Sequence, residues 1–260
     1  MEWPIPIPGV EYYYVDDYAA IIHGDSLEIL PNIPDDTFDL CLTDPPYGIG
    51  YNNGTDLGSV YSQIFDSGRK KSAPKAITND DSLSIAIEVL QKAALATHPK
   101  MKNGAAFCCF SAGGGGTPVT PKFTIALAEI FTLKDTIIWE KARQGLGVHI
   151  RRSYETIIVL QKGAPCHRWN GGHKTSDVWH YPGMYSKPSG HPAEKPVPVL
   201  SKFIQVYSDA GDIVIDPFMG SGTTLEAAKS LNRRCIGIEL SEEYCEMAVQ
   251  RLQQEVFNFA

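Results

Sequence analysis

The stretch "DIVIDPFMGSGTT", residues 212–224, carries the strongest fold signal in the chain. Its first half is a short apolar run, which is typical of a strand buried on both faces of a sheet. Gly220 and Gly222 then give a turn, and "TTLEAAKSLN" continues with a helical pattern. A strand, a glycine turn and a helix in this order predict an α/β protein.

Strands alternate with helices along most of the remaining sequence. The other predicted strands are "AAIIHGD" (19–25), "FDLCLTD" (38–44), "AAFCCF" (105–110), "DTIIWEK", "YETIIVLQK" and "RCIGIEL". Helical patterns follow in "SLEILPNI", "PKFTIALAEIF", "VPVLSKFIQVYS", "SEEYCEMAVQRLQQEV" and "DSLSIAIEVLQKAALATH", the last with Asp81 or Ser82 as its cap. Apolar strands separated by amphipathic helices predict a doubly wound sheet with helices on both faces.

The composition indicates one domain over residues 1–260, because 43% hydrophobic content can bury a large core. Two segments without a clear period are interpreted as a loop insertion at 52–80 and a loop module at 163–190. With no membrane-length apolar run and no secretory signal pattern at the start, we expect a cytoplasmic protein. The six cysteines show no C-x-x-C spacing and are expected to be reduced and mostly buried.

Charge is unevenly distributed along the sequence. The net charge of −7 argues mildly against a polyanionic partner, yet residues 141–174 carry seven Lys or Arg and a single acid. A second basic group lies at 69–75. A basic zone on an acidic body suits local contact with nucleic acid, and a solvated surface explains the same charges equally well.

"DPPY", residues 44–47, is an unusual way to end a strand. Proline lacks an N–H and restricts the residue before it, so the segment presents carbonyls and one carboxylate on a stiff backbone. Asp44 and the carbonyl of Pro45 could accept both hydrogens of an exocyclic base amine and so polarise its nitrogen. Tyr47 could stack on the flat base. A simple loop-forming run is the alternative.

The glycine turn and "GIEL" together indicate an adenosine-containing cofactor. Glycines let the backbone approach a ligand, and a helix start offers free N–H groups. Glu239 follows about 20 residues later at the next strand end, where an acid commonly binds a ribose diol. The alternatives are that the glycines serve packing and that Glu239 caps the next helix.

In this order the motifs resemble those of the S-adenosylmethionine-dependent DNA amino-methyltransferases of the β group. "DPPYGIGY" is similar to the family's catalytic motif, "DPFMGSGTT" to its glycine-rich motif and "GIEL" to its acidic motif. "GDSLEIL", "IIWEK", "RRSYETIIVL" and "SGHPAEKPVPVL" resemble further segments of that family. The resemblance implies a Rossmann-like, mostly parallel sheet of seven strands, with an antiparallel hairpin strand and a circularly permuted motif order.

The resemblance also implies roles for single residues. Asp44, Pro45, Pro46 and Tyr47 would form the base-amine site. Asp25 would contact the adenine of S-adenosylmethionine, Glu239 its ribose hydroxyls and Lys195 its methionine end, although an exposed lysine at a helix start is the alternative for Lys195. The remaining cofactor contacts would come from Asp216, Pro217, Phe218, Gly220, Ser221, Gly222 and Thr223.

The implied reaction is direct methyl transfer to the amine of a base flipped out of double-stranded DNA. An aspartate at the start of the motif favours N6 of adenine, with N4 of cytosine as the alternative. Segment 163–190 would recognise the target or, alternatively, only cover the cofactor. Its histidines fit no zinc spacing, so no metal is expected. The candidate DNA contacts are Arg69, Lys70, Lys141, Arg143, Arg151, Arg152, Arg168, Trp169 and Lys174.

Other functions stay open at this point. A methyltransferase for RNA bases or protein amides is one alternative, although the protein-amide motif usually begins with asparagine rather than Asp44. A silent nucleic-acid-binding subunit is another, although such a subunit needs neither "DPPY" nor the glycine turn. The missing G-x-G-x-x-G argues against a nicotinamide oxidoreductase. The sequence leaves open a homodimer, the recognised DNA site and an accompanying restriction enzyme.

Overall fold

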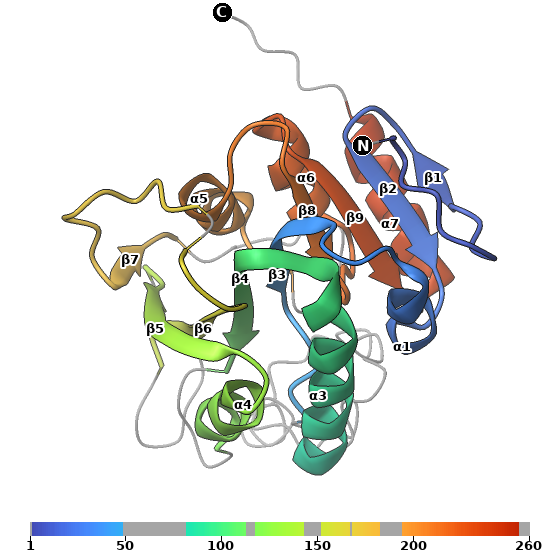
Figure 1. The fold of residues 1–260 in the computed structure, drawn as a ribbon. Helices are drawn as coiled ribbons and strands as arrows, with labels where there is room; N and C mark the ends of the chain where they lie inside the picture. The colour runs from blue at the N-terminus through green and yellow to red at the C-terminus, as the bar shows by residue number, and fades with distance from the viewer. Residues whose placement is uncertain are drawn as a thin grey trace, which may run out of the picture.

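The computed structural model describes residues 2–48, 82–112, 118–142, 152–166, 168–182 and 194–254. Within these ranges one sheet runs through the molecule (Figure 1). Its nine strands are β1 (Tyr14–Val15), β2 (Ala19–His23), β3 (Phe38–Thr43), β4 (Met101–Ser111), β5 (Thr132–Glu140), β6 (Tyr154–Gln161), β7 (Val178–His180), β8 (Ile213–Asp216) and β9 (Arg234–Glu239).

The strands lie in the order β1-β2-β9-β8-β3-β4-β6-β5-β7. β2, β9, β8, β3 and β4 are parallel, and β6 is antiparallel to both β4 and β5. The mostly parallel sheet, its antiparallel hairpin strand and the seven predicted strands are therefore confirmed. The sheet is wider than predicted, because the two-residue β1 and the three-residue β7 add to its two edges.

β7 corrects the interpretation of 163–190 as a module separate from the structural layers. It pairs with β5, and Trp179 at its centre is buried against Phe203. The strand lies among glycines and prolines and is too short to show an alternating pattern. The predicted insertion at 52–80 lies outside the described residues.

Helices cover both faces of the sheet (Figure 1). On one face lie α1 (Ser26–Ile29), α3 (Leu83–Lys100) and α4 (Val119–Ala128), and on the other α5 (Val197–Tyr207), α6 (Thr223–Ser230) and α7 (Glu242–Gln253). The short 3-10 helix η1 (Leu30–Asn32) continues α1. Of the two predicted caps for α3, Ser82 is the observed one, since its side chain accepts from the N–H of Ile85.

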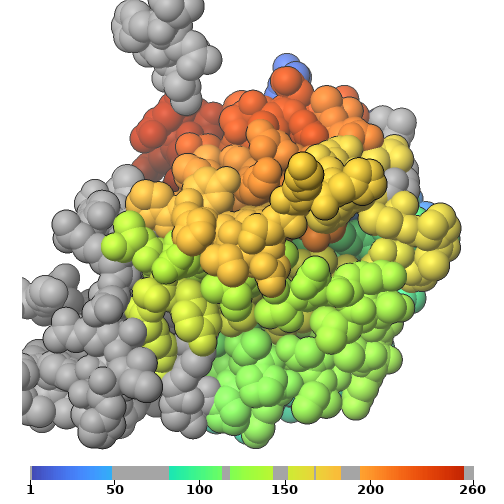
Figure 2. All heavy atoms as spheres, turned by 90° about the vertical axis from the view of Figure 1, so that its left-hand side faces the viewer, coloured from blue at the N-terminus to red at the C-terminus, as the bar shows by residue number. Residues whose placement is uncertain are grey.

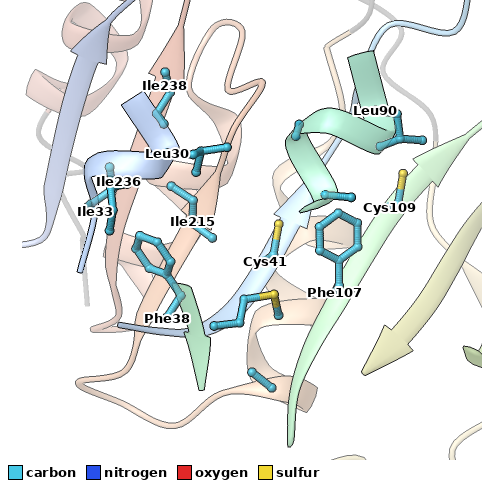
Figure 3. Packing of buried hydrophobic residues seen from close by; sticks show 14 of the residues in the cluster. Leu30, Ile33, Phe38, Cys41, Leu90, Phe107, Cys109, Ile215, Ile236 and Ile238 are labelled. Carbon is cyan, nitrogen blue, oxygen red and sulfur yellow. The ribbon is translucent and has the colours of Figure 1, made fainter. Parts of the chain in front are cut away.

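Alternating side chains of each strand divide the core into two layers. Cys41, Phe107 and Ile215 belong to the layer under α3 and α4, where Figure 3 shows Leu90 of α3 close to Phe107 and Cys109. Leu42, Cys108 and Val214, their neighbours in sequence, belong to the layer under α5, α6 and α7. Burial on both faces explains why the strands are continuous apolar runs.

Two expectations from composition can be compared with the structure. Five of the six cysteines are buried, all six are free thiols, and Cys166 alone is exposed. In the described part of the chain, no helix is long and apolar enough to span a membrane.

The parallel strands bring distant parts of the sequence to one edge. β8, from the last quarter of the chain, lies between β9 and β3. The carboxyl ends of β2, β9, β8 and β3 are therefore neighbours, and "HGD", "GIEL", "DPFMGSG" and "DPPY" follow these four strands. Ligands of open α/β sheets bind at this edge, so it is the first place to look for a site.

Candidate active site at the carboxyl edge of the sheet

Asp44 lies in a partly buried niche directly after β3. Its Oδ1 accepts a hydrogen bond from the Tyr47 hydroxyl at 2.5 Å, and its Oδ2 pairs with the ammonium group of Lys195. Pro45 is buried and Pro46 half-buried, so the stiff step holds both neighbours in place. The structure thus joins Asp44, Tyr47 and Lys195 across 151 positions of sequence.

Lys195 enters this niche from the segment just before α5. Its side chain is 9% exposed, which excludes the alternative of an exposed lysine at a helix start. The ammonium nitrogen lies 5.5 Å from the ring centre of Tyr47 and 5.4 Å from that of Phe110. Its predicted contact with the methionine end of the cofactor stays a prediction.

Glu155, near the start of β6, adds a second carboxylate to the niche. Its Oε1 accepts from the ammonium of Lys141, and its Oε2 lies 3.6 Å from the nitrogen of Lys195. Two carboxylates and two ammonium groups therefore alternate in the order Asp44, Lys195, Glu155, Lys141. Such alternation offsets the cost of taking four charges out of water.

Burial and charge act in opposite directions on these groups. Burial raises the pKa of Asp44, and the ammonium of Lys195 offsets this only in part. Burial alone would raise the pKa of Glu155 as well, but Lys195 and Lys141 hold it below its usual value. Burial would lower the pKa of Lys195, and the two carboxylates raise it instead. At neutral pH Lys195 is therefore an ammonium group.

Asp216 lies behind the glycine turn and has its carboxylate engaged inside the protein. One oxygen accepts from the Thr43 hydroxyl at 2.9 Å and from the N–H of Phe218 at 3.2 Å. The other accepts from the Thr224 hydroxyl at 2.6 Å. Despite these donors, burial raises the pKa of Asp216 to about 7. Asp216 thus holds the turn together and connects it to β3.

The two glycines of the turn have different tasks. Gly220 has a φ of +52° and donates its N–H to Glu239 at 2.9 Å. Gly222 begins α6 with a φ of +79°, and a Cβ on it would lie 2.6 Å from the Cβ of Ala248. Gly222 is therefore required for the packing of α7. Among the other turn residues, Phe218 is half-buried, and those buried are Pro217, Ser221 and Thr223.

Glu239 and Asp25 lie on either side of this turn at adjacent strand ends. Glu239 also accepts from the N–H of Ser241 at 2.8 Å, and burial raises the pKa of its carboxyl. Asp25 caps α1 by accepting from the N–H of Leu27 at 2.9 Å. His23, two residues before Asp25, is in register with Glu239. The predicted adenosine contacts are thus brought together at one place.

Arg251 of α7 ties the glycine turn to the segment that carries Lys195. It donates to the carbonyl of Ser221 at 2.9 Å and to Glu226 at 2.7 Å, and it pairs with Glu194. The side chain of Glu194 is fully buried. The two halves of the edge are therefore connected by a buried arginine.

The predicted DNA contacts are not all at this edge. Lys141 and Arg152 follow β5 and precede β6, which places them near Asp44, although Lys141 is engaged by Glu155. Arg168 pairs with Asp209 at 2.7 Å, and Trp169 packs on Tyr207. The candidates outside the described residues are Arg69, Lys70, Arg143 and Arg151.

Segment 168–177 lies at the opposite, amino-terminal edge of the sheet. Asn170 donates its N–H to the carbonyl of Val206, near the end of α5, and the next strand, β8, begins at that edge. Figure 2 shows this face, where a cavity of about 730 Å³ lies between segment 168–177 and β5. Arg168, Trp169 and the exposed Lys174 are thus separated from Asp44 by the length of the sheet.

Three residues of the site were missed by sequence reasoning. Thr43 ends a buried strand, Glu155 follows an exposed tyrosine, and Arg251 lies in an amphipathic helix. Of these, only Glu155 had a usable signal, since it is the single acid in the basic zone of residues 141–174. The partners of Thr43 and Arg251 depend on which strands and helices become neighbours.

Comparison with known proteins decides the family. The model of a family described as DNA methylase, which covers N6 and N4 enzymes, matches residues 38–250, including Asp44, Glu155, Lys195 and the glycine turn. The chain belongs to this DNA methylase family. The resemblance to the β group of amino-methyltransferases is confirmed, and this DNA methylase is a member of the N6-adenine or N4-cytosine methyltransferases.

Curated and solved relatives agree over nearly the whole chain. DNA adenine methyltransferase YhdJ of Escherichia coli (strain K12) is 27% identical over 270 residues, which cover 91% of this DNA methylase and 83% of the relative. PvuII DNA methyltransferase (cytosine-N4-specific) superposes with a TM-score of 0.73 at 19% identity, covering 97% and 92% of the two chains.

A DNA modification methylase from Thermus thermophilus, solved in complex with S-adenosyl-L-methionine, superposes with a TM-score of 0.64 at 22% identity. The match covers 92% of this DNA methylase and 95% of the Thermus chain. At such identities the two solved structures establish the shared fold.

Proposed function

We propose that this DNA methylase transfers a methyl group from S-adenosylmethionine to the exocyclic amine of a base in double-stranded DNA, and that the base is adenine, modified at N6. The observation that carries the proposal is the position of Asp44. Its carboxylate lies in a partly buried niche, one residue after Thr43, which is hydrogen-bonded to the carboxylate behind the glycine turn.

The residues at the ends of β2, β9 and β8 fit an adenosine-containing cofactor. Glu239 has a mostly buried carboxylate with one backbone donor on each oxygen, which leaves acceptor capacity for ribose hydroxyls. Asp25 uses one oxygen as a cap and has the other for an adenine amine. When bound, S-adenosylmethionine would supply a methyl group that its sulfonium charge already activates.

The protein's part in the reaction is to position and polarise the amine. The amine's lone pair is delocalised into the base ring, so it is a poor nucleophile. Asp44 and the carbonyl of Pro45 would accept its two hydrogens and shift electron density onto nitrogen. Because Pro45 and Pro46 fix these acceptors beforehand, little reorganisation is needed when the base arrives.

Adenine is favoured over cytosine by the residue at the start of the motif. The family resemblance associates Asp44 with N6 of adenine more often than with N4 of cytosine. The 27% identical Escherichia coli relative is named a DNA adenine methyltransferase, and the match covers both motifs. The cytosine-specific PvuII enzyme shares the fold, so N4-methylcytosine is the outcome that competes in the test.

DNA would approach the carboxyl edge. A target base in a duplex must be flipped out to reach Asp44, which costs a few kcal/mol. Arg152 lies at this edge and would bind phosphate, and Lys141 would do so once it leaves Glu155. We omit Arg168, Trp169 and Lys174 from this interface because of their distance from Asp44.

The experiment is a methyl-transfer assay with S-adenosylmethionine carrying a labelled methyl group. Mixed-sequence duplex DNA, RNA and a protein extract are offered separately as acceptors, with Asp44→Asn as the inactive variant and the surface variant Asp135→Asn as its control. We expect label in DNA with the wild type and the control, and a loss of at least about 100-fold with Asp44→Asn. Label in RNA or protein alone would overturn the proposal.

A further inference from the structure

One buried carboxylate oxygen in the niche has no hydrogen-bond donor among the described residues. It is Oε2 of Glu155, which lies 3.6 Å from the nitrogen of Lys195, whereas Oε1 of the same group is engaged by Lys141. Buried acceptors without a donor are rare because they lose the hydrogen bonds that water gave them. The position of this oxygen therefore calls for an explanation.

The ammonium of Lys195 conflicts with the proposed reaction where it now lies. It occupies Oδ2 of Asp44, while the Tyr47 hydroxyl occupies Oδ1 at 2.5 Å. A base amine that donates to Asp44 would compete with this ammonium for the same oxygen. As the amine nitrogen forms its bond to the methyl carbon it gains positive charge, and a neighbouring ammonium opposes that charge.

We propose that Glu155 is a positioning residue that receives the ammonium of Lys195 when the target amine binds Asp44. The inference rests on the proposed function. The distance of 3.6 Å exceeds a normal charge-assisted hydrogen bond by less than about 1 Å, so a small rotation of the lysine side chain completes it. Oε2 of Glu155 then has its donor, and Asp44 has a free oxygen.

The surroundings permit this small movement without exposing the charge. The ammonium lies at similar distances from the rings of Tyr47 and Phe110, 5.5 Å and 5.4 Å, and aromatic faces stabilise a cation. The movement changes no protonation state. It leaves Asp44 as the nearest negative charge to the reacting nitrogen, where it stabilises the developing positive charge.

A cycle of variants tests the proposal through the rate of a single turnover at saturating cofactor and DNA. With Lys195 present, we expect Glu155→Gln to lower the rate at least about tenfold, because the ammonium then stays on Asp44. In the background of Lys195→Met there is no ammonium to receive, so the same change should cost less than about twofold. An equal loss in both backgrounds, or no loss in either, would overturn the proposal.

Controls separate this effect from damage to the fold. Glu140→Gln removes a carboxylate from the end of β5, where it pairs with exposed His180, and should leave the single-turnover rate unchanged. Binding of S-adenosylmethionine and the melting temperature are measured for every variant. A merely structural role of Glu155 would lower both and would not depend on Lys195.

A second measurement does not require methyl transfer. In a crystal structure of the Asp44→Asn variant, the ammonium of Lys195 should lie within about 3.0 Å of Oε2 of Glu155, because only that carboxylate keeps its charge. An ammonium still bound to the side chain at position 44 would overturn the proposal. If the wild type methylates no acceptor but the lysine moves as expected, the proposed function fails and the movement stands.

Discussion

The hydroxyl of Thr43 donates a hydrogen bond of 2.9 Å to the carboxylate of Asp216, across 173 positions of sequence. Thr43 ends β3, one residue before Asp44, and Asp216 ends β8, just before the glycine turn. Both side chains are 2% exposed. This contact fixes the candidate base site relative to the candidate cofactor site, and methyl transfer in line requires that alignment.

Replacing Thr43 with valine keeps its shape and removes the hydroxyl. We expect Thr43→Val to lower the free energy of unfolding by about 1–3 kcal/mol, because a buried acceptor loses its donor. The methyl-transfer rate should fall by more than the affinity for cofactor, since alignment changes and contact does not. Urea unfolding and single-turnover kinetics measure the two effects. Thr124→Val, which removes a hydroxyl bonded within α4, should leave the methyl-transfer rate unchanged.

Arg251 provides a test of the link between the glycine turn and Lys195. Arg251→Met leaves Glu194 buried without its partner, so we expect a loss of about 3–5 kcal/mol in unfolding free energy. Because the carbonyl of Ser221 is also released, cofactor affinity should fall roughly tenfold, measured by calorimetry.

The matched variant is Arg233→Met, since Arg233 bonds the Ser208 carbonyl at 2.6 Å before β8, away from the turn. It should lower stability and leave cofactor affinity intact. Equal cofactor affinities for the Arg251 and Arg233 variants would contradict the proposed link.

The pH dependence of stability should carry a contribution from Asp216. Its pKa is raised from 3.8 to about 7 by burial, so between these values the folded protein holds a proton that the unfolded chain has released. Folding stability from this group is therefore greatest at low pH and is lost as pH rises toward 7. Relative to Asp216→Asn, the wild type should become less stable between about pH 4.5 and about pH 7.5. Parallel urea-unfolding results at both pH values would rule this out.

Binding to DNA should depend on the carboxyl edge and not on the opposite one. Arg152→Ala should reduce the slope of log affinity against log salt by about 1, the effect of one phosphate contact. Arg168→Ala and Lys174→Ala should leave that slope unchanged, because both residues lie at the amino-terminal edge. Fluorescence anisotropy at several salt concentrations measures the slopes. A larger effect from Arg168 than from Arg152 would show that DNA binds the other edge.

Much of this fold follows from local sequence. The seven predicted strands, such as "FDLCLTD" and "RCIGIEL", are apolar runs because they are buried on both faces, and their order relative to the glycine turn indicates the permuted sheet. β7 was not predictable, because Trp179 becomes part of the core only when β5 offers an edge.

The site was predictable where a motif is continuous in sequence and not where it is assembled. Asp44, Gly220 and Glu239 stand at strand ends, and the family resemblance names them. The pairing of Lys195 with both Asp44 and Glu155 joins three separate segments. Arg168 and Trp169 show the opposite error, since position in a basic segment did not reveal that they lie at the far edge of the sheet.

The measurement that tests the central claim most directly is mass spectrometry of nucleosides. Double-stranded DNA of mixed sequence is incubated with the purified protein and S-adenosylmethionine, digested, and compared with DNA treated with Asp44→Ala. We predict N6-methyladenine with the wild type and none with the variant. N4-methylcytosine would contradict the choice of base, and no methylated nucleoside on any duplex would contradict the proposed function itself.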